Sequence, residues 1–347
     1  MNPKSFYHLL FATAAAVIAA VALWIYSPSY STDKAFGEKL APDMLEKIND
    51  VAVMSVEHGG ETTNFLKDAA GNWFLIEAEN YPASKERIRN VLIGLANLEK
   101  IEPKTALPEY YPDIAVEDAG EKAQSYLVTL LNGEGQTLLN LLIGKSTRGI
   151  SWNGQGYFVR KPDEAQSWLV RGSADVTGGM LTWLDTELAS FAQEDIASVS
   201  FIDSTKKREV RFKYDTNLSE LRPEYGSDGY FQKSDRYVDR MTKALTSMDF
   251  VNVGRRPAGL EKLTPYLSVR VETNSGLLQY FLVYLINDTP YAALDFHALA
   301  GASESVKSYA KTLKTGFEPW IYQIPASKLR AIDPFIPLPE KNKHERQ

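Results

Sequence analysis

Cysteine is absent from the 347-residue chain, and histidine occurs only four times. Without cysteine there is no disulfide, no thiolate metal ligand and no cysteine nucleophile. Four scattered histidines do not supply a histidine-rich metal site by themselves. A basic excess is also missing, since the net charge is -6, and this argues against nucleic acid as a partner. The histidines are His8, His58, His297 and His344.

What is present is the composition of a folded protein. The chain is 44% hydrophobic, 11% aromatic and 24% charged, which excludes a disordered chain. Its length suits one large domain or two smaller ones.

The only long apolar run lies near the amino terminus, where 9–26 contains no charged residue. A helix of this length just spans a hydrocarbon core of about 30 Å. Lys4 precedes the run, and Trp24 and Tyr26 at its far end suit a membrane interface. The sequence therefore predicts a short cytoplasmic tail over 1–8, a single bilayer-spanning helix over 9–26 and a spacer over 27–42. The bulk of the chain would then lie in the periplasm of a bacterial inner membrane.

A cleaved signal peptide is the alternative interpretation of this run. Ala20-Val21-Ala22 fits an A-x-A cleavage site. The run is longer than an ordinary signal core and continues past that site through Leu23-Trp24-Ile25, which favours an uncleaved anchor.

Strand-like runs alternate with one helix-like run in the first half of the remaining chain. Ser84 is a good helix cap and precedes an apolar stripe with helical spacing, so we expect a helix that ends by Ile101-Glu102-Pro103. The stripe consists of Ile88, Val91, Leu92, Leu95 and Leu98. Strands are predicted at 51–56, 63–67, 73–77, 126–131, 137–143, 157–159 and 168–170.

The second half repeats this order. Strands are predicted at 196–202, 209–214 and 229–231, followed by a helix from Ser234. The stripe of this helix aligns without gaps on that of the first at a constant offset of 150 residues. It consists of Val238, Met241, Leu245 and Met248.

These patterns predict an α+β fold made of a duplicated unit, in which an antiparallel meander sheet packs with one long amphipathic helix. The first repeat is expected over 43–192 and the second over 193–337, with a flexible tail over 338–347. Two unrelated amphipathic helices in one α+β domain are the simpler alternative.

The segment Gly144-Lys145-Ser146-Thr147 resembles the end of a phosphate-binding loop. Such a loop needs glycine five residues before Gly144, where this chain has Leu139. We therefore expect no nucleotide site here.

Asp295 and His297 are two residues apart in a predicted strand and would face the same side, where an acid could orient an imidazole. No G-x-S-x-G nucleophile elbow accompanies them. A hydrogen-bonded structural pair is the expected role.

The remaining polar clusters have simple structural interpretations. Adjacent residues in a strand point apart, so Glu57 and His58 do not share a metal. Short runs of like charge usually form solvated faces or turns, and aromatic residues in apolar settings pack in cores or interfaces. The acidic runs are Asp43, Glu46, Asp50 and Glu117, Asp118, Glu121; the basic runs are Lys206-Lys207-Arg208 and Arg255-Arg256; the aromatic sites are Trp183-Leu184 and Trp320 with Tyr322. No catalytic, cofactor-binding or metal-binding residues are therefore assigned, and no cofactor is expected.

Several apolar and aromatic stretches, taken in order along 45–325, resemble the domain-of-unknown-function 4340 family of bacterial proteins. They are Ala83-Ser84-Lys85, Tyr157-Phe158-Val159-Arg160, Trp168-Leu169-Val170, Trp183-Leu184-Asp185, Asp195-Ile196-Ala197-Ser198-Val199 and Trp320-Ile321-Tyr322-Gln323-Ile324-Pro325.

The resemblance implies one membrane segment, a repeated α+β extracytoplasmic region and an association with ABC-type transport components of the gliding-motility kind. We therefore expect a non-enzymatic accessory or scaffold protein of such an assembly, with membrane-protein partners. An envelope polysaccharide or peptidoglycan hydrolase is one alternative, and a soluble periplasmic ligand-binding protein, if the segment is cleaved, is another.

Overall fold

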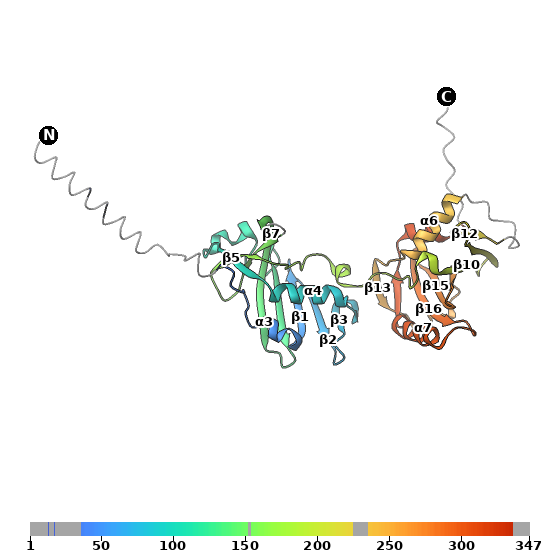
Figure 1. The fold of residues 1–347 in the computed structure, drawn as a ribbon, viewed down its shortest axis with the longest axis horizontal. Helices are drawn as coiled ribbons and strands as arrows, with labels where there is room; N and C mark the ends of the chain where they lie inside the picture. Colours follow the sequence, from blue (N-terminus) through green and yellow to red (C-terminus); the bar gives the residue numbers. More distant parts are fainter. Residues whose placement is uncertain (1–12, 14–16, 18–35, 152–153, 225–234, 336–347) are drawn as a thin grey trace, which may run out of the picture. The chain divides into compact units, whose positions relative to one another are not determined.

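A computed structural model of the chain describes residues 13, 17, 36–151, 154–224 and 235–335 (Figure 1). Apart from Thr13 and Val17, the apolar run 9–26 lies outside this part, as do the predicted strand 229–231 and the tail 338–347. Among the described residues, no helix combines the length and the apolar character needed to cross a bilayer.

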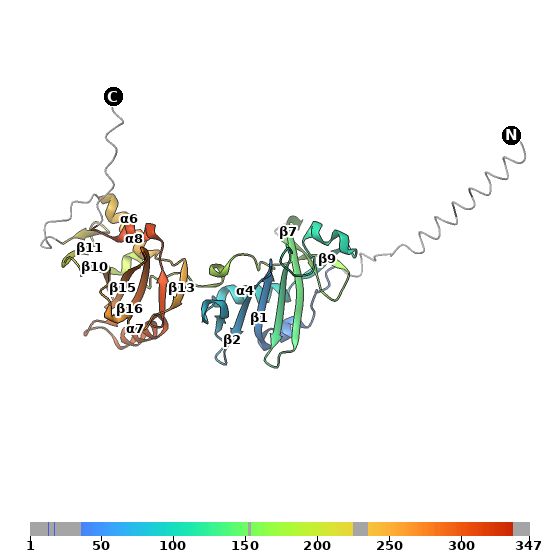
Figure 2. The same cartoon turned by 180° about the vertical axis from the view of Figure 1, so that it is seen from behind.

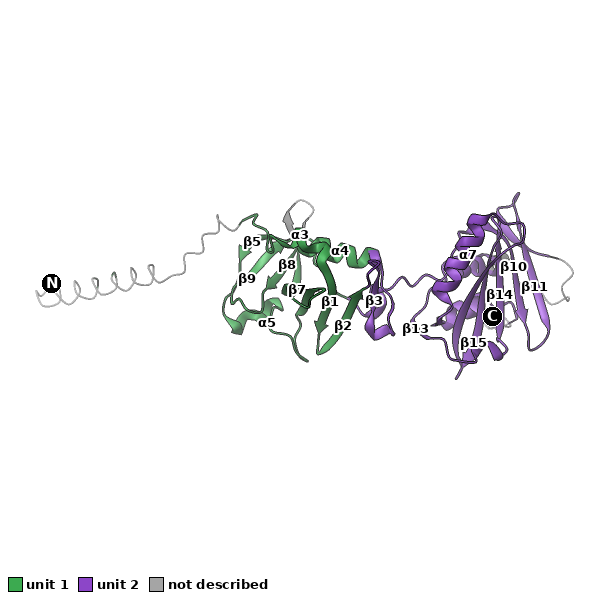
Figure 3. Ribbon diagram, turned by 90° about the horizontal axis from the view of Figure 1, so that it is seen from below, with its two compact units in different colours: residues 1–67, 86–177 green, residues 68–85, 178–347 purple. Residues whose placement is uncertain are grey.

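The fold is α+β, with one antiparallel sheet of nine strands, another of eight, and short helices. The chain divides into two compact units (Figure 3). The first contains residues up to Lys67 and Glu86–Thr177; the second contains Asp68–Lys85 and the chain from Gly178 onward.

The first sheet has the strand order β4-β3-β2-β1-β6-β7-β8-β9-β5. Its strands are β1 Val51–His58, β2 Glu61–Lys67, β3 Trp73–Leu75, β4 Tyr81–Pro82, β5 Glu99–Pro103, β6 Tyr126–Asn132, β7 Thr137–Ser151, β8 Gly154–Arg160 and β9 Ser167–Arg171. The helical elements of this part of the chain are α3 Met44–Lys47, η1 Ile48–Asp50, η2 Ile76–Ala78, α4 Lys85–Ala96, η3 Pro108–Tyr110 and α5 Tyr111–Ile114.

Helix α4 covers one face of the first unit's sheet (Figure 1). Its predicted stripe is buried, with Leu95 only 1% exposed. Residues of β1 alternate accordingly: Met54 and Val56 are buried, whereas Val53 and Ser55 are partly exposed. Burial of these apolar groups is the main force that holds the helix on the sheet.

A strap of residues 37–40 completes the edge of the first unit's sheet beside β5. The Gly37 amide donates to the Lys100 carbonyl at 2.9 Å, and the Leu40 amide donates to the Leu98 carbonyl at 2.8 Å. These bonds satisfy backbone groups that an exposed edge strand would leave free.

The second sheet has the order β12-β11-β10-β14-β15-β16-β17-β13. Its strands are β10 Ile196–Asp203, β11 Arg208–Asp215, β12 Glu220–Pro223, β13 Asn252–Arg255, β14 Leu267–Thr273, β15 Leu277–Ile286, β16 Thr289–Ala298 and β17 Trp320–Gln323. The accompanying helices are η4 Met180–Trp183, η5 Gln193–Asp195, α6 Asp235–Thr246, η6 Leu260–Lys262, α7 Glu304–Phe317 and α8 Ala326–Ile332.

Three local expectations need correction. The predicted strand 73–77 ends at Leu75, because Ile76–Ala78 turns into a 3₁₀ helix. Helix α4 ends at Ala96, and Ile101-Glu102-Pro103, expected to terminate the helix, lies within edge strand β5. The second unit has more than one long helix, since α7 has 14 residues. No helix was predicted there, although Val306, Ala310, Leu313 and Phe317 have helical spacing.

The two units share one strand order once β4 is set aside. Matching β1 to β10, β2 to β11, β3 to β12, β5 to β13 and β6–β9 to β14–β17 superimposes the orders of the two sheets. Helices α4 and α6 both have 12 residues, and their starts, Lys85 and Asp235, are 150 residues apart.

Finer features correspond as well. A β-bulge between Val51 and Val53 on β1 recurs between Ile196 and Ser198 on β10. The strap bond from Leu40 recurs where the Leu188 amide donates to the Met248 carbonyl at 2.7 Å.

Candidate functional site

The second sheet has one buried face and one face with a polar row that runs across five strands. Ser200 lies opposite Arg211 on one side and Arg270 on the other. Arg270 lies opposite Tyr280, and Tyr280 lies opposite Asp295. Directly opposed side chains on one face of a sheet are close enough to interact, so these five residues form a continuous cross-strand row.

Asp295 at the end of this row joins β16 to helix α7. One carboxylate oxygen, Oδ1, is 2.9 Å from Lys314 Nζ, and the other, Oδ2, is 2.9 Å from His297 Nε2. The sequence correctly placed Asp295 and His297 on one side of a strand. Lys314, which arrives from α7, was missed; the helical spacing of Val306, Ala310, Leu313 and Phe317 is the signal that could have revealed this helix.

Two hydrogen-bond partners, Lys314 and His297, determine the protonation state of Asp295. Burial by itself would raise its pKa, but hydrogen bonds from Lys314 and His297 outweigh burial and lower the pKa below the ordinary value. Asp295 is therefore an ionised acceptor at neutral pH.

A histidine oriented by an acid acts as a general base only when a nucleophile or water reaches its other nitrogen. In the described part of the chain, the hydrogen-bond partner of His297 is Asp295, and the ring of Tyr280 meets the imidazole edge-on at 5.7 Å. The imidazole is half exposed. The arrangement can bind a polar group or hold α7, but it lacks a positioned nucleophile among the described residues.

The other cations of the row are also paired. Arg270 Nη2 lies 2.8 Å from Glu272 Oε2, and Arg211 Nε lies 3.4 Å from Glu224 Oε2. Surface pairs of this kind contribute little stability individually, and they leave the row with balanced charge.

The motif at Gly144, which resembles the end of a phosphate-binding loop, lies in β7, under helix α5. A Cβ at Gly144 would come within 2.2 Å of the Ile114 carbonyl oxygen, so only glycine fits there. Lys145 Nζ donates to the Asp113 carbonyl at 2.8 Å. Both residues thus serve the packing of the α5 segment on the sheet.

Glu57 and His58 lie on opposite faces of the sheet and have different neighbours. His58 Nδ1 is 3.0 Å from the Ser125 carbonyl, and its ring stacks on Tyr126 with centroids 3.9 Å apart. Glu57 lies opposite Leu127, on the opposite face of the sheet from its neighbour His58.

The acidic clusters are dispersed. Asp43 makes an i,i+4 ion pair with Lys47 at 3.6 Å. Asp118 pairs with the buried guanidinium of Arg160, which also donates from Nε to the Val116 carbonyl at 2.9 Å and covers the Tyr111 ring. Among the described residues, no three His, Cys, Asp or Glu side chains gather in a way that could hold a metal.

Arginines of the two basic clusters contact acidic, carbonyl and aromatic groups of their own unit. Arg208 is 2.7 Å from Asp203 and stacks over Phe335. Arg255 stacks over Trp320 at 4.0 Å and donates to the Glu79 carbonyl at 3.1 Å.

The aromatic sites belong to the core. Trp320 and Tyr322 are 4% and 0% exposed, and Trp183 and Leu184 are equally buried. The Tyr81 ring packs edge-on against Trp320, with centroids 4.9 Å apart. Burial raises the pKa of Tyr81 to about 12 even though it shares a hydrogen bond with Tyr322, so both hydroxyls stay neutral.

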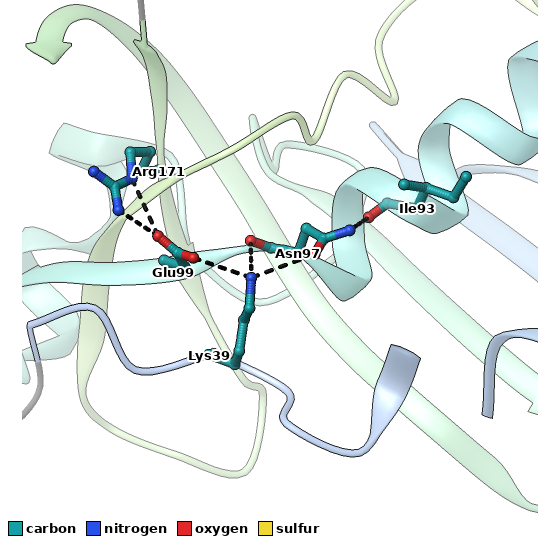
Figure 4. A network of polar contacts seen from close by, with 5 residues as sticks. All are labelled: Lys39, Ile93, Asn97, Glu99 and Arg171. Carbon is teal, nitrogen blue, oxygen red and sulfur yellow. Dashed lines mark hydrogen bonds and ion pairs between the residues drawn. The ribbon is translucent and has the colours of Figure 1, made fainter. Parts of the chain in front are cut away.

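A polar network at the edge of the first unit was not found from the sequence (Figure 4). Glu99 of β5 receives Lys39 Nζ at 3.0 Å and also pairs with Arg171 of β9. Lys39 also contacts Asn97, which follows α4. Hydrogen bonds from Arg171 and Lys39 lower the pKa of Glu99. Because the partners are 58 to 72 residues apart in sequence, no local pattern signals the network.

The first unit also has an open cavity of about 320 Å³. It is bounded by residues 40–44 and Lys47, by 137–140 at the start of β7, and by Lys161 and Asp163. Its lysines are already engaged, Lys47 with Asp43 and Lys161 with Glu164.

Comparison with known proteins gives one match. Searches of curated proteins and of solved structures found no similar protein. A scan against protein-family models matched residues 73–264 to the family described as "Domain of unknown function (DUF4340)". The match covers more than half of the chain, from β3 to the segment that follows β13. The chain therefore belongs to the DUF4340 family.

Proposed function

We propose that this protein is a non-enzymatic accessory or scaffold component of an ABC-type transport assembly. The observation that supports a contact role most directly is that both carboxylate oxygens of Asp295 are already bound, one by Lys314 and the other by His297. The other polar motifs of the sequence are likewise engaged in bonds that support the fold, as at Lys145 and Arg255.

The proposed architecture is a duplicated sheet-and-helix unit behind a membrane anchor at 9–26. The shared strand order, the two 12-residue helices and the recurrent β-bulge support a duplication.

The link to an ABC-type transporter rests on the family resemblance alone. Affinity purification of the full chain from detergent-solubilised membranes tests it. We expect transporter subunits to co-purify with the wild-type chain; their absence, with the chain intact and folded, would contradict the assignment.

The proposed placement is single-pass in a bacterial inner membrane, with the bulk of the chain periplasmic. A reporter that works only in the periplasm should be active when fused after Gln347, and the purified protein should keep Met1 or Asn2 at its amino terminus. A mature terminus at Leu23 would instead favour a soluble periplasmic protein.

A further inference from the structure

The two units differ in the segment that leads from the strap to the first strand of each sheet. The recurrent strap bonds and β-bulges make Leu40 equivalent to Leu188 and the start of β1 equivalent to the start of β10. In the second unit this segment runs from 188 to 196, and in the first it runs from 40 to 51 and is therefore longer. Helix α3 occupies the extra length and lies beside the start of β7 (Figure 1 and Figure 2).

A buried glutamine closes this corner in the second unit. Gln279 of β15 is fully buried. Its Nε2 donates to the Leu188 carbonyl at 2.6 Å, and its Oε1 accepts a hydrogen bond from the Ser190 amide at 3.1 Å. One side chain thereby ties the chain after the strap to the sheet and satisfies two backbone groups.

The first unit lacks both partners of this tie. Following the ladders across the equivalent strands places Leu139 at the position of Gln279. Pro42, two residues after Leu40, stands at the position of Ser190. A leucine side chain has no polar group and proline has no amide hydrogen, so the Leu40 carbonyl has no equivalent of the glutamine donor.

The open cavity of about 320 Å³ in the first unit lies at this corner, between α3 and the start of β7. Leu40, Met44 and Leu139 border it, and they are only 4%, 2% and 5% exposed. Its volume is at the lower end of the range of small-molecule sites, about 300–1,000 Å³, which are typically apolar with a few polar groups. The corner that a glutamine closes in one unit is therefore an apolar hollow in the other.

Charges of both signs stand at the rim of this cavity. Lys161 and Asp163 follow β8, and Lys47 and Asp43 belong to α3 and its N-cap. Asp163 has no ion-pair partner among the described residues. Lys161 is 3.0 Å from Glu164 in a partly exposed pair, and pairs of this kind contribute little energy. A ligand carboxylate can therefore replace Glu164 at Lys161.

We propose that this cavity binds a small zwitterion with an apolar side chain, such as a free amino acid. The lysines of the rim would hold its carboxylate, and Asp163 and the Leu40 carbonyl would accept hydrogen bonds from its ammonium group. Its apolar side chain would pack against Met44 and Leu139. Such binding is independent of the proposed association with a transporter.

Isothermal titration calorimetry of the full chain in detergent, with L-leucine as the probe, tests the proposal. We expect saturable binding, with a dissociation constant at least about tenfold higher in Lys161→Gln and in Asp163→Asn, because each variant removes a charged partner of the ligand. Lys122→Gln is the matched control, since Lys122 is exposed elsewhere in the same unit, and it should leave the affinity unchanged. The absence of saturable binding would overturn the proposal, as would wild-type affinity in both rim variants.

Two analogues of the probe test the class of ligand. Isocaproate lacks the ammonium group of leucine and isoamylamine lacks its carboxylate, whereas both keep the branched apolar chain. Each should bind at least about tenfold more weakly than L-leucine, because the rim groups of one sign are then left without a partner. Binding of either analogue as tight as that of L-leucine would contradict a site for zwitterions.

Discussion

At the scale of single residues, the close approach of another backbone segment explains the glycine in a motif whose sequence resembles a phosphate-binding loop. Gly144 admits the Ile114 carbonyl, which would lie 2.2 Å from a Cβ. Gly144→Ala should therefore reduce the free energy of unfolding by about 1–3 kcal/mol through overpacking. Gly133, in the hairpin between β6 and β7, has no atom near its Cβ position, so Gly133→Ala is the control and should have little effect. Chemical denaturation of the two variants measures the contrast, and an undisturbed Gly144→Ala protein would show that the α5 segment does not pack as described.

The ionised carboxylate of Asp295 should make the stability of the fold depend on pH. Because its pKa is lowered in the folded state, its contribution to stability is present above the unfolded-state pKa of about 3.9 and is lost as the pH falls through the folded-state value. At pH 7, Asp295→Asn should cost about 0.2–1 kcal/mol, the range of partly exposed ion pairs.

Denaturation at several pH values would follow that difference. The wild-type and Asp295→Asn proteins should become equally stable at low pH, once the carboxyl is protonated in both the folded and unfolded wild-type chain. A difference that stays constant or grows as the pH falls through the acid range would show that the pairs with Lys314 and His297 do not stabilise the fold.

At the scale of elements, the two equivalent helices should respond alike. Leu95 of α4 and Leu245 of α6 are 1% and 0% exposed, so Leu95→Ala and Leu245→Ala should each cost about 2–5 kcal/mol. Ile93→Ala, at an exposed position of α4, should cost far less. Thermal or denaturant unfolding provides the measurement, and a mild effect of either leucine variant would contradict the packing of that helix.

The elements also show what periodicity can and cannot predict. Helix α4 was predicted because its apolar stripe faces a sheet, and strands β1–β3 and β6–β11 were predicted because alternating burial leaves a period of two. No bounds were predicted for β12 or for β14–β17. Helix α7 was missed although Val306, Ala310, Leu313 and Phe317 have the spacing of an amphipathic helix and Ser303 caps its start. Edge strands β5 and β13 were missed because they are short and partly polar.

The candidate site likewise combines contacts that the sequence could predict with contacts that it could not. Asp295 and His297 were placed together correctly because two residues on one strand share a face. Lys314, and the network of Lys39, Glu99 and Arg171, depend on contacts between distant segments. No spacing in a single sequence encodes such contacts.

At the scale of the whole molecule, the chain has two units with a shared strand order whose sheet faces carry different side chains. In the first unit Leu66, Val53 and Leu131 lie side by side on one face, whereas the corresponding positions of the second unit include Lys213 and Glu272, and Glu272 is paired with Arg270. The proposed contact role predicts that function depends on surfaces and on membrane attachment rather than on one reactive group.

The most direct test of that claim is complementation of a deletion strain by the double variant Asp295→Asn, His297→Gln. The account predicts function close to that of the wild-type gene, because exposed contacts of this kind contribute little energy. Loss of a proton-transfer group from an enzyme would instead reduce catalysis by about 10²–10⁴-fold. A double variant that stays folded and membrane-bound yet loses all function would contradict a role by contact and indicate an enzyme.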